Sequence, residues 1–379
     1  MNSLGKELNC LRRLAVPPPQ AHIMAHQKHA KLTRPNPGTF SGMEWAILGI
    51  SSDRIKELAV AWIQALSGPY RLAFVDADFK RLDETFRLKG FQHRAFFRNV
   101  DAVLADGNHF PAQRQIVVID ANNSLEQQLP QLTQVDLMLL EEGQNEIPGY
   151  LKEQVAGRKV SIFSLNDQDR ITQWLATQLQ AAIPPIKGLV LAGGRSTRMK
   201  QDKGLLKYHG KNQREHAYEL LESLLGRGQV HLSCRQDQVA GMADHLQALP
   251  DTFLGLGPFG GILSALREDP NAAWLVIACD LPLLTENSLR HLLEARNPSV
   301  LATAFQSPID ELPEPLIALW EPRAYATLLE FLAMGQASPR QVLLHSKIEL
   351  IQATQAIELT NVNLPEEFQT VKATLNQPT

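Results

Sequence analysis

The sequence predicts an α/β protein made of two three-layer α/β/α domains. Short apolar runs typical of buried strands alternate along most of the chain with amphipathic stretches at helical spacing. This alternation is typical of mostly parallel sheets covered by helices on both faces. It is interrupted at Pro184-Pro185 in "QAAIPPIKG", which indicates a domain boundary near residue 185.

The composition limits the classes of partner and compartment. The chain has 37 basic and 40 acidic residues and a net charge of −3. It therefore has no overall positive field for nucleic acid or an anionic membrane, and we expect neither as a partner. Cys10, Cys234 and Cys279 are far apart and form no CxxC pair, which favours a reducing, cytoplasmic location. No apolar run is long enough to span a membrane, and the N-terminus lacks the apolar core of a signal peptide.

Residues 1–42 are predicted to be a flexible N-terminal arm. "VPPPQ" and "RPNPG" interrupt any periodic pattern, and the segment is rich in Pro, His, Lys and Arg. Met24 is an alternative start of the protein, in which case the first 23 residues would not be translated. An ordinary disordered terminus is the other interpretation.

Residues 43–183 are predicted to form the first domain. Its expected strands are four apolar runs, "WAILGI" (45–50), "RLAFVDAD" (71–78), "QIVVID" (115–120) and "DLMLLEEG" (136–143). The amphipathic stretch "DRIKELAVAWIQAL" (53–66) is expected to be a helix.

Residues 184–379 are predicted to form the second domain. Its expected strands are "IKGLVLAGG" (186–194), "QVHLSC" (229–234), "AAWLVIACD" (272–280), "SVLATAF" (299–305), "EPLIALW" (314–320) and "IELI" (348–351). Helical patterns separate most of these runs, which again predicts a layered α/β fold.

The stretch "GLVLAGGRSTRMKQDKGLL" suggests a phosphate-binding loop. Glycines after a strand permit close backbone approach to a ligand, although Gly-Gly alone is also typical of a plain tight turn. Here the backbone N–H groups from Ala192 to Gly194 are followed within nine positions by basic residues that include Arg195, Arg198 and Lys203. Such cations are suited to neutralise a nucleoside triphosphate.

Asp280 is the candidate metal ligand. It follows a buried run in "WLVIACDLPLL", so its carboxylate is expected at the edge of the sheet where ligands bind in α/β folds. Oxygen ligands of this kind suit Mg²⁺, which also bridges phosphates. The alternative is that Asp280 caps the helix beginning near Thr285. Cys279 is expected to be a packed small residue.

These motifs resemble those of the molybdenum cofactor guanylyltransferase family of nucleotidyltransferases. "LAGGRSTRMKQDKGLL" is similar to the family signature L-A-G-G-x-S-x-R-M-G-x-D-K, with Lys200 in place of a glycine. "PDTFLGLGPFGGILSAL" (250–266) resembles the family segment whose aspartate, here Asp251, recognises guanine. The resemblance implies a nucleotide-binding set of Leu191, Ala192, Gly193, Gly194, Arg195, Lys203, Asp251, Gly257 and Gly260.

Three later segments extend the resemblance. "EPLIALW" is similar to a family strand near the pterin side, and "ASPRQVLLHS" (337–346) makes Arg340 a candidate for binding the phosphate of the acceptor. "LTNVNLPEEF" (359–368) resembles the terminal N-x-N-T-P-E-E motif, which makes Asn363 a second metal ligand beside Asp280. The implied fold is a Rossmann-like nucleotidyltransferase of the nucleotide-diphospho-sugar transferase type.

The function implied by the resemblance is transfer of GMP from GTP to molybdopterin, with release of pyrophosphate. The expected cofactor is Mg²⁺, and the expected catalytic residues are Arg198, Lys203 and Asp280. The expected partners are GTP and molybdopterin or molybdenum cofactor, and molybdoenzyme apoproteins or cofactor-insertion proteins are further candidates. Two alternatives stay open: a cytidylyltransferase or sugar-phosphate nucleotidyltransferase of the same fold, and a non-catalytic nucleotide-binding regulator.

The first domain is predicted to be a degenerate P-loop-like domain that does not hydrolyse NTP. Counting from Gly49, the positions that G-x-x-x-x-G-K-[ST] requires as Gly, Lys and Ser/Thr are Arg54, Ile55 and Lys56. "LAFVDAD" and "DLMLLEEGQNEIP" nevertheless resemble the molybdopterin-guanine dinucleotide biosynthesis adapter protein, a P-loop partner of the guanylyltransferase. A generic α/β domain is the alternative.

Overall fold

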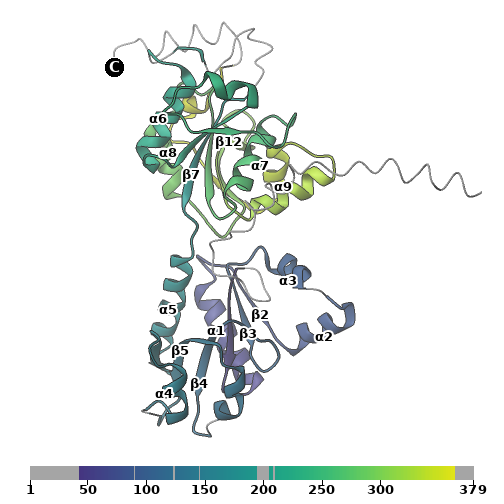
Figure 1. Ribbon diagram of the computed structural model, residues 1–379, viewed down its shortest axis with the longest axis vertical. Helices are drawn as coiled ribbons and strands as arrows, with labels where there is room; N and C mark the ends of the chain where they lie inside the picture. Colours follow the sequence, from purple (N-terminus) through teal and green to yellow (C-terminus); the bar gives the residue numbers. More distant parts are fainter. Residues whose placement is uncertain are drawn as a thin grey trace, which may run out of the picture. The chain divides into compact units, whose positions relative to one another are not determined.

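The first half of the chain forms a fully parallel sheet. The computed structural model describes residues 42–88, 90–122, 124–144, 146–193, 205–207 and 210–362. Among them, a six-stranded sheet has the order β2-β3-β1-β4-β5-β6 (Figure 1). Its strands are β1 Met43–Leu48, β2 Leu72–Val75, β3 Ala102–Asp106, β4 Arg114–Ile119, β5 Gln134–Leu140 and β6 Ser161–Ser164. This order differs from the two common doubly wound orders, 3-2-1-4-5-6 and 2-1-3-4-5.

Helices cover both faces of this sheet. One face packs against α1 (Ser52–Leu66) and α5 (Gln168–Ala181) through a core that contains Trp45 and Trp62, both fully buried. The other face packs against the remaining elements, which are α2 Ala77–Phe86, α3 Gly90–Phe97, the 3₁₀ helix η3 Ser124–Gln131 and α4 Gly149–Gln154. The alternation of side chains along each strand, with Ile47 and Leu48 in different cores, produces this three-layer arrangement.

The second half forms a seven-stranded mixed sheet in the order β13-β11-β12-β10-β7-β8-β9. Its strands are β7 Ile186–Leu191, β8 Val230–Cys234, β9 Ala248–Pro250, β10 Ala273–Ala278, β11 Ala302–Gln306, β12 Pro313–Trp320 and β13 Glu349–Ile351. Strands β9-β8-β7-β10 are parallel and follow the 3-2-1-4 order of a Rossmann-like sheet, which confirms the predicted Rossmann-like α/β architecture of this half.

One strand of the second sheet runs against its neighbours. Strand β12 is antiparallel to both β10 and β11. The chain between β11 and β12 is short and closes as a hairpin, with Ser307 N–H donating to the Leu312 carbonyl over 2.8 Å. A connection of this length cannot carry the chain back across the sheet, so the pair must be antiparallel.

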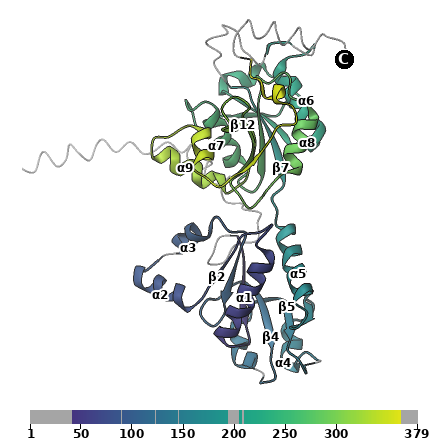
Figure 2. The same cartoon turned by 180° about the vertical axis from the view of Figure 1, so that it is seen from behind.

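The second sheet is also covered on both faces, as Figures 1 and 2 show from opposite sides. One core involves α6 (Gln213–Leu225) and α8 (Glu286–Glu294), and the other involves α7 (Pro258–Glu268), α9 (Ala324–Ala333) and α10 (Pro339–Leu344). The 3₁₀ helices η5 (Gln236–Gly241) and η6 (Ala356–Leu359) complete this half. Within the described residues, no helix is long and apolar enough to cross a membrane.

The predicted strands and the predicted helix over 53–66 are confirmed, with ends displaced by one to three residues at most positions. Strands β3, β6 and β9 were not predicted. Residues 1–41, predicted as a flexible arm, lie outside the described residues.

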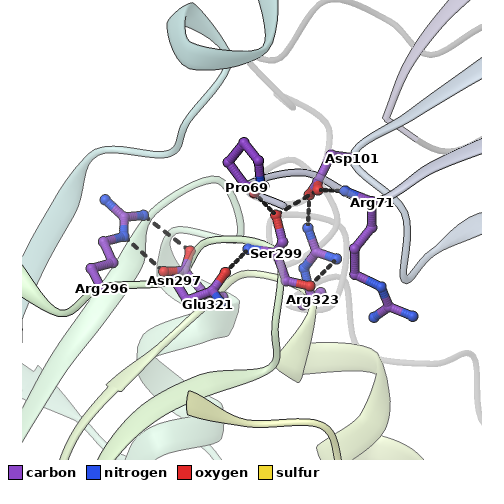
Figure 3. A network of polar contacts seen from close by, with 8 residues as sticks. All are labelled: Pro69, Arg71, Asp101, Arg296, Asn297, Ser299, Glu321 and Arg323. Carbon is purple, nitrogen blue, oxygen red and sulfur yellow. Dashed lines mark hydrogen bonds and ion pairs between the residues drawn. The ribbon is translucent and has the colours of Figure 1, made fainter. Parts of the chain in front are cut away.

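Asp101 is the centre of a polar network that joins distant parts of the chain (Figure 3). Its Oδ2 accepts hydrogen bonds from the Arg71 backbone N–H over 2.7 Å and from the Ser299 hydroxyl over 2.6 Å. Its Oδ1 accepts from the Arg323 guanidinium over 2.6 Å, and Arg323 also donates to the Ser299 carbonyl over 3.3 Å. All four residues belong to the compact unit Arg34–Thr379.

Two further ion pairs support the same region. Arg296 forms a bidentate pair with Glu321, with N–O distances of 2.7 and 3.0 Å, and the Glu321 side chain is almost fully buried. Arg98 pairs with Glu330 on α9. Burial makes the Arg296 and Glu321 charges costly to leave unpaired, whereas the more exposed Arg98–Glu330 pair contributes little.

We expect Asp101→Ala to lower the free energy of unfolding by about 3 kcal/mol, because it leaves the mostly buried Arg323 guanidinium without its carboxylate. Urea denaturation followed by circular dichroism measures this loss. The control is Arg290→Ala, which removes an exposed pair with Glu286 and should change the free energy by about 0.5 kcal/mol or less. Equal effects of the two variants would contradict the structural role of Asp101.

Candidate functional site

The carboxyl ends of β7, β8, β9 and β10 meet at one edge of the second sheet, and the candidate site lies there. At the end of β7, Ala192 N–H donates to the Ser233 carbonyl over 3.1 Å, and Gly193 follows. A Cβ on Gly193 would lie 3.3 Å from Asp251 Oδ2 and 3.5 Å from the Cys234 Cα. The absence of a side chain therefore keeps the end of β7 close to β8 and to the residue after β9.

Four residues predicted to bind or neutralise the triphosphate cannot be placed. Gly194, Arg195, Arg198 and Lys203 lie outside the described residues, which stop at Gly193 and resume at residue 205. Their roles stay predictions.

Asp251 lies at the same edge of the sheet. It follows β9, and its backbone N–H donates to the Cys234 carbonyl over 2.8 Å. The Ser233 hydroxyl donates to its Oδ1 over 2.7 Å. Burial raises the pKa of the Asp251 carboxyl above its ordinary value, while the hydrogen bond from Ser233 opposes that rise.

Arg235 is a site residue that the sequence analysis did not identify. Its guanidinium donates to the Gly193 carbonyl over 3.1 Å and forms two bonds of 3.0 Å to Asp237. It thus connects the end of β8 to Gly193, the glycine at the start of the predicted phosphate-binding loop. A basic residue directly after a strand that borders this edge, in "SCRQDQ", was the available signal.

Asp280 lies at the end of β10, where the sequence predicted it. Its backbone carbonyl accepts a hydrogen bond of 2.9 Å from the N–H of Val362, the residue before Asn363. Asn363 itself is outside the described residues. The alternative role of Asp280 as a helix cap is not observed, because Thr285 is the N-cap of α8 and accepts from the Ser288 N–H.

A second contact anchors the segment before Asn363. The Glu358 carboxylate, which is almost completely buried, accepts from the Thr285 hydroxyl over 2.9 Å. Residues 356–362 are therefore attached both to the cap of α8 and to Asp280.

Backbone conformation or close packing requires glycine at several positions around the start of α7. Gly257 is the N-cap and has φ +56° and ψ −137°, a conformation that strongly favours glycine. A Cβ on Gly260 would lie 2.3 Å from the Phe253 carbonyl, and one on Gly261 would lie 2.7 Å from the Ser233 hydroxyl. These residues let α7 pack directly against the strand that supports Asp251.

Arg340, the candidate for the acceptor phosphate, is already paired. It lies on α10 and donates to Asp310 over 2.7 Å and to Glu314 over 3.2 Å. Because β12 is antiparallel to β10, Glu314 near its beginning lies at the same edge as Asp280. An acceptor phosphate at Arg340 would have to compete with these two carboxylates.

The two cysteines of this half are unsuited to nucleophilic chemistry. Cys234 and Cys279 are both free and buried, as expected for packed small residues. Burial raises the pKa of the Cys234 thiol to about 11, so this thiol is protonated near neutral pH.

The edge of the first sheet differs from a phosphate-binding site. Only Gly49, Ile50 and Ser51 separate β1 from α1. The Gly49 N–H donates to the Gln128 side chain over 3.0 Å, and Asn108 donates to the Ile50 carbonyl over 3.2 Å. The Gly49 N–H, which could otherwise donate to a phosphate, is thus occupied by a side chain of the chain itself.

The acidic residue Asp76 at this edge also has a structural role. Asp76 caps α2 by accepting from the N–H groups of Asp78 and Phe79, and it pairs with Lys56 over 2.9 Å. These bonds hold the pKa of Asp76 below its ordinary value despite its partial burial.

The fold and this strand edge define a nucleotidyltransferase, and residues 188–350 match the MobA-like NTP transferase domain. The chain belongs to the molybdenum cofactor guanylyltransferase family. It is 35% identical over 190 residues to a molybdenum cofactor guanylyltransferase of Xanthomonas euvesicatoria pv. vesicatoria (strain 85-10), a match that covers 48% of this chain and 93% of that protein.

Two further similarities concern about half of the chain. A molybdenum cofactor biosynthesis bifunctional protein of Synechocystis sp. is 32% identical over 185 residues, and the chain spans only 53% of its length. The crystal structure of molybdopterin-guanine dinucleotide biosynthesis protein A from Archaeoglobus fulgidus matches 50% of this chain and 97% of that chain, with 22% identity and a TM-score of 0.43. The family assignment does not depend on this last match.

We expect Gly261→Ala to destabilise the second half by about 1–3 kcal/mol, because its Cβ would be forced against the Leu191 side chain and the Ser233 hydroxyl. Thermal unfolding measures the effect. The control is Gly68→Ala, where no neighbouring atom lies within 4 Å of the new Cβ. If both variants melt like the wild type, α7 does not pack as described.

Proposed function

We propose that this chain transfers GMP from GTP to molybdopterin and releases pyrophosphate. The observation that carries this proposal is the partly buried Asp251 carboxylate, oriented by Ser233 beside Gly193 at the same strand edge as Asp280. An ionised carboxylate only accepts hydrogen bonds, and guanine offers two adjacent donors, N1–H and the N2 amino group. Cytosine and adenine each combine an acceptor with one donor amino group on the corresponding edge, so they pair less well with a carboxylate.

The proposed reaction is an in-line displacement at the α-phosphorus of GTP. A terminal phosphate oxygen of the acceptor forms the new P–O bond, and the bond to the β-phosphate oxygen breaks to release pyrophosphate. Because the attacking phosphate is already ionised, no general base is required. The protein's part is to position the two substrates and to neutralise charge, for which Arg198 and Lys203 are the proposed residues.

The donor atoms at the end of β10 suit a divalent metal, with Mg²⁺ as the proposed ion. Within the described part of the chain, no three His, Cys, Asp or Glu side chains form a ready metal cluster. This fits an ion that takes one or two protein oxygens and completes its shell with water and substrate phosphates. Asp280 is the proposed carboxylate ligand and Asn363 the proposed amide ligand. The bound ion would neutralise charge on the phosphates.

The first half of the chain is proposed to act without a nucleotide of its own. The short β1–α1 connection and the bond from Gly49 to Gln128 support this proposal. Its proposed role is to present the cofactor precursor, or an apoenzyme that receives the product, to the second half. Covalent connection would raise their effective concentration.

A panel of nucleotides with Mg²⁺ tests the function directly. Among GTP, CTP, UTP and ATP, GTP should raise the melting temperature most, since a ligand stabilises the form to which it binds. A larger shift with CTP would favour the cytidylyltransferase alternative. Stabilisation by GTP without turnover of molybdopterin would favour a non-catalytic regulator.

We expect Asp280→Asn to lower kcat by at least about 100-fold with the fold retained, because a neutral amide replaces the anionic metal ligand. Steady-state turnover at saturating Mg²⁺ is the measurement. The exposed Asp244→Asn serves as the control and should behave as the wild type. Activity of Asp280→Asn within a few-fold of the wild type would argue against the metal assignment.

We expect Asp251→Ala to lower the GTP-to-CTP preference in kcat/KM by about 10- to 100-fold, because the acceptors for the guanine donors are removed. The effect should come mainly from weaker use of GTP. An unchanged ratio would mean that Asp251 does not recognise the base.

A further inference from the structure

Two buried serine hydroxyls hold the segment that carries the base-recognition residue. Ser233 on β8 donates to the Asp251 carboxylate over 2.7 Å. Ser264 on α7 accepts from the Thr252 backbone N–H over 2.8 Å and donates to the Gly260 carbonyl over 2.7 Å. Both side chains are almost completely buried. One serine therefore contacts the carboxylate, whereas the other contacts the main chain beside it and the Thr252 hydroxyl, over 3.2 Å.

We propose that Ser233 is a positioning residue for nucleotide selection: its hydroxyl fixes the rotation of the Asp251 carboxylate so that this carboxylate accepts both donors of guanine. This inference rests on the proposed function, and it adds a determinant of specificity that does not itself touch the nucleotide.

The geometry around Asp251 supports a fixed orientation. The main chain is held by the bond from Asp251 N–H to the Cys234 carbonyl. Oδ1 is then directed to Ser233 on β8, while Oδ2 lies on the side of Gly193, where a Cβ would approach it to 3.3 Å. Because Oδ1 is directed to Ser233 and Oδ2 to the side of Gly193, the plane of the carboxylate is fixed before a base binds. Such preorganisation lowers the cost of binding.

The charge of Asp251 depends on this hydroxyl. Burial raises the pKa of the Asp251 carboxyl, and the bond from Ser233 is the contact that lowers it. Within the described residues, no basic side chain hydrogen-bonds to Asp251. Nearby on β8, the Cys234 thiol is protonated, since its pKa is about 11.

Two other charged residues near this edge are Arg235 and Arg214. Arg235 donates to Asp237 and to the Gly193 carbonyl. Arg214, in the first turn of α6, lowers the pKa of the Cys234 thiol electrostatically. From α7, the groups that approach Ser233 and the Asp251 segment are Gly261 and Ser264, which carry no charge.

The sign of the pH dependence follows from these contacts. GTP binding requires ionised Asp251, so affinity should increase as the pH rises through the pKa of this carboxyl in the folded protein. Without Ser233 that pKa moves further upward, because burial is then unopposed. The rise in GTP affinity should therefore occur at a higher pH.

The test compares Ser233→Ala with Ser264→Ala in the full chain. Dissociation constants of GTP and CTP are measured by calorimetry across the pH range in which the wild type stays folded. For Ser233→Ala we expect GTP binding about 10- to 100-fold weaker near neutral pH, CTP binding within a few-fold of the wild type, and a pH profile displaced upward. For Ser264→Ala we expect no displacement of the pH profile, because the carboxylate keeps its donor.

The outcomes separate the inference from the function. Preference of the wild type for GTP, with an unchanged profile in Ser233→Ala, would overturn the role of Ser233 alone. No preference for GTP in the wild type would overturn the function, and the inference with it. Should Ser233→Ala not fold, Ser233→Cys keeps the volume and supplies a weaker donor, so a smaller upward displacement supports the inference and an unchanged profile overturns it.

Discussion

The parallel pairing of β7 with β8 on one side and with β10 on the other is the constraint on which the candidate site depends. It brings the carboxyl ends of strands far apart in the sequence to one edge, so that Gly193, Asp251 and Asp280 share a surface. Close packing of α7, possible because Gly260 and Gly261 have no side chains, holds that edge from one face. The positions of the proposed site residues therefore depend primarily on the register of the strands and secondarily on side-chain contacts.

Hydrophobic patterning was sufficient to predict the architecture of both halves in outline. Fully buried strands such as β1 and β10 are continuous apolar runs, and the helix at α1 has an unambiguous 3.6-residue period. The strands that were missed are short or carry polar residues. Strand β6 is only partly buried, β9 has three residues, and β3 ends in the buried carboxylate of Asp106.

The site was predictable only where a residue acts through its own chemistry. Asp280 could be proposed because a carboxylate after a buried strand has a recognisable use, whereas Asp251 was proposed only from its place in the family segment. Ser233 could not be identified, since its importance comes from a partner 18 residues away in the sequence. Arg235 was recognisable only as a basic residue after a strand, because its bond to Gly193 joins residues 42 positions apart. The ion pairs of Arg340 were unpredictable for the same reason, and Arg340 must break them before it can bind an anion.

The attachment of Val362 to Asp280 has a consequence for synthesis of the protein. Strand β7 begins at Ile186, yet the edge that it forms is completed by a segment made long afterwards. During translation, the first sheet has all its strands available while the second still lacks β13 and residues 356–362. A nascent chain could thus complete its first sheet while the edge that carries Asp280 still lacks the segment that is hydrogen-bonded to it.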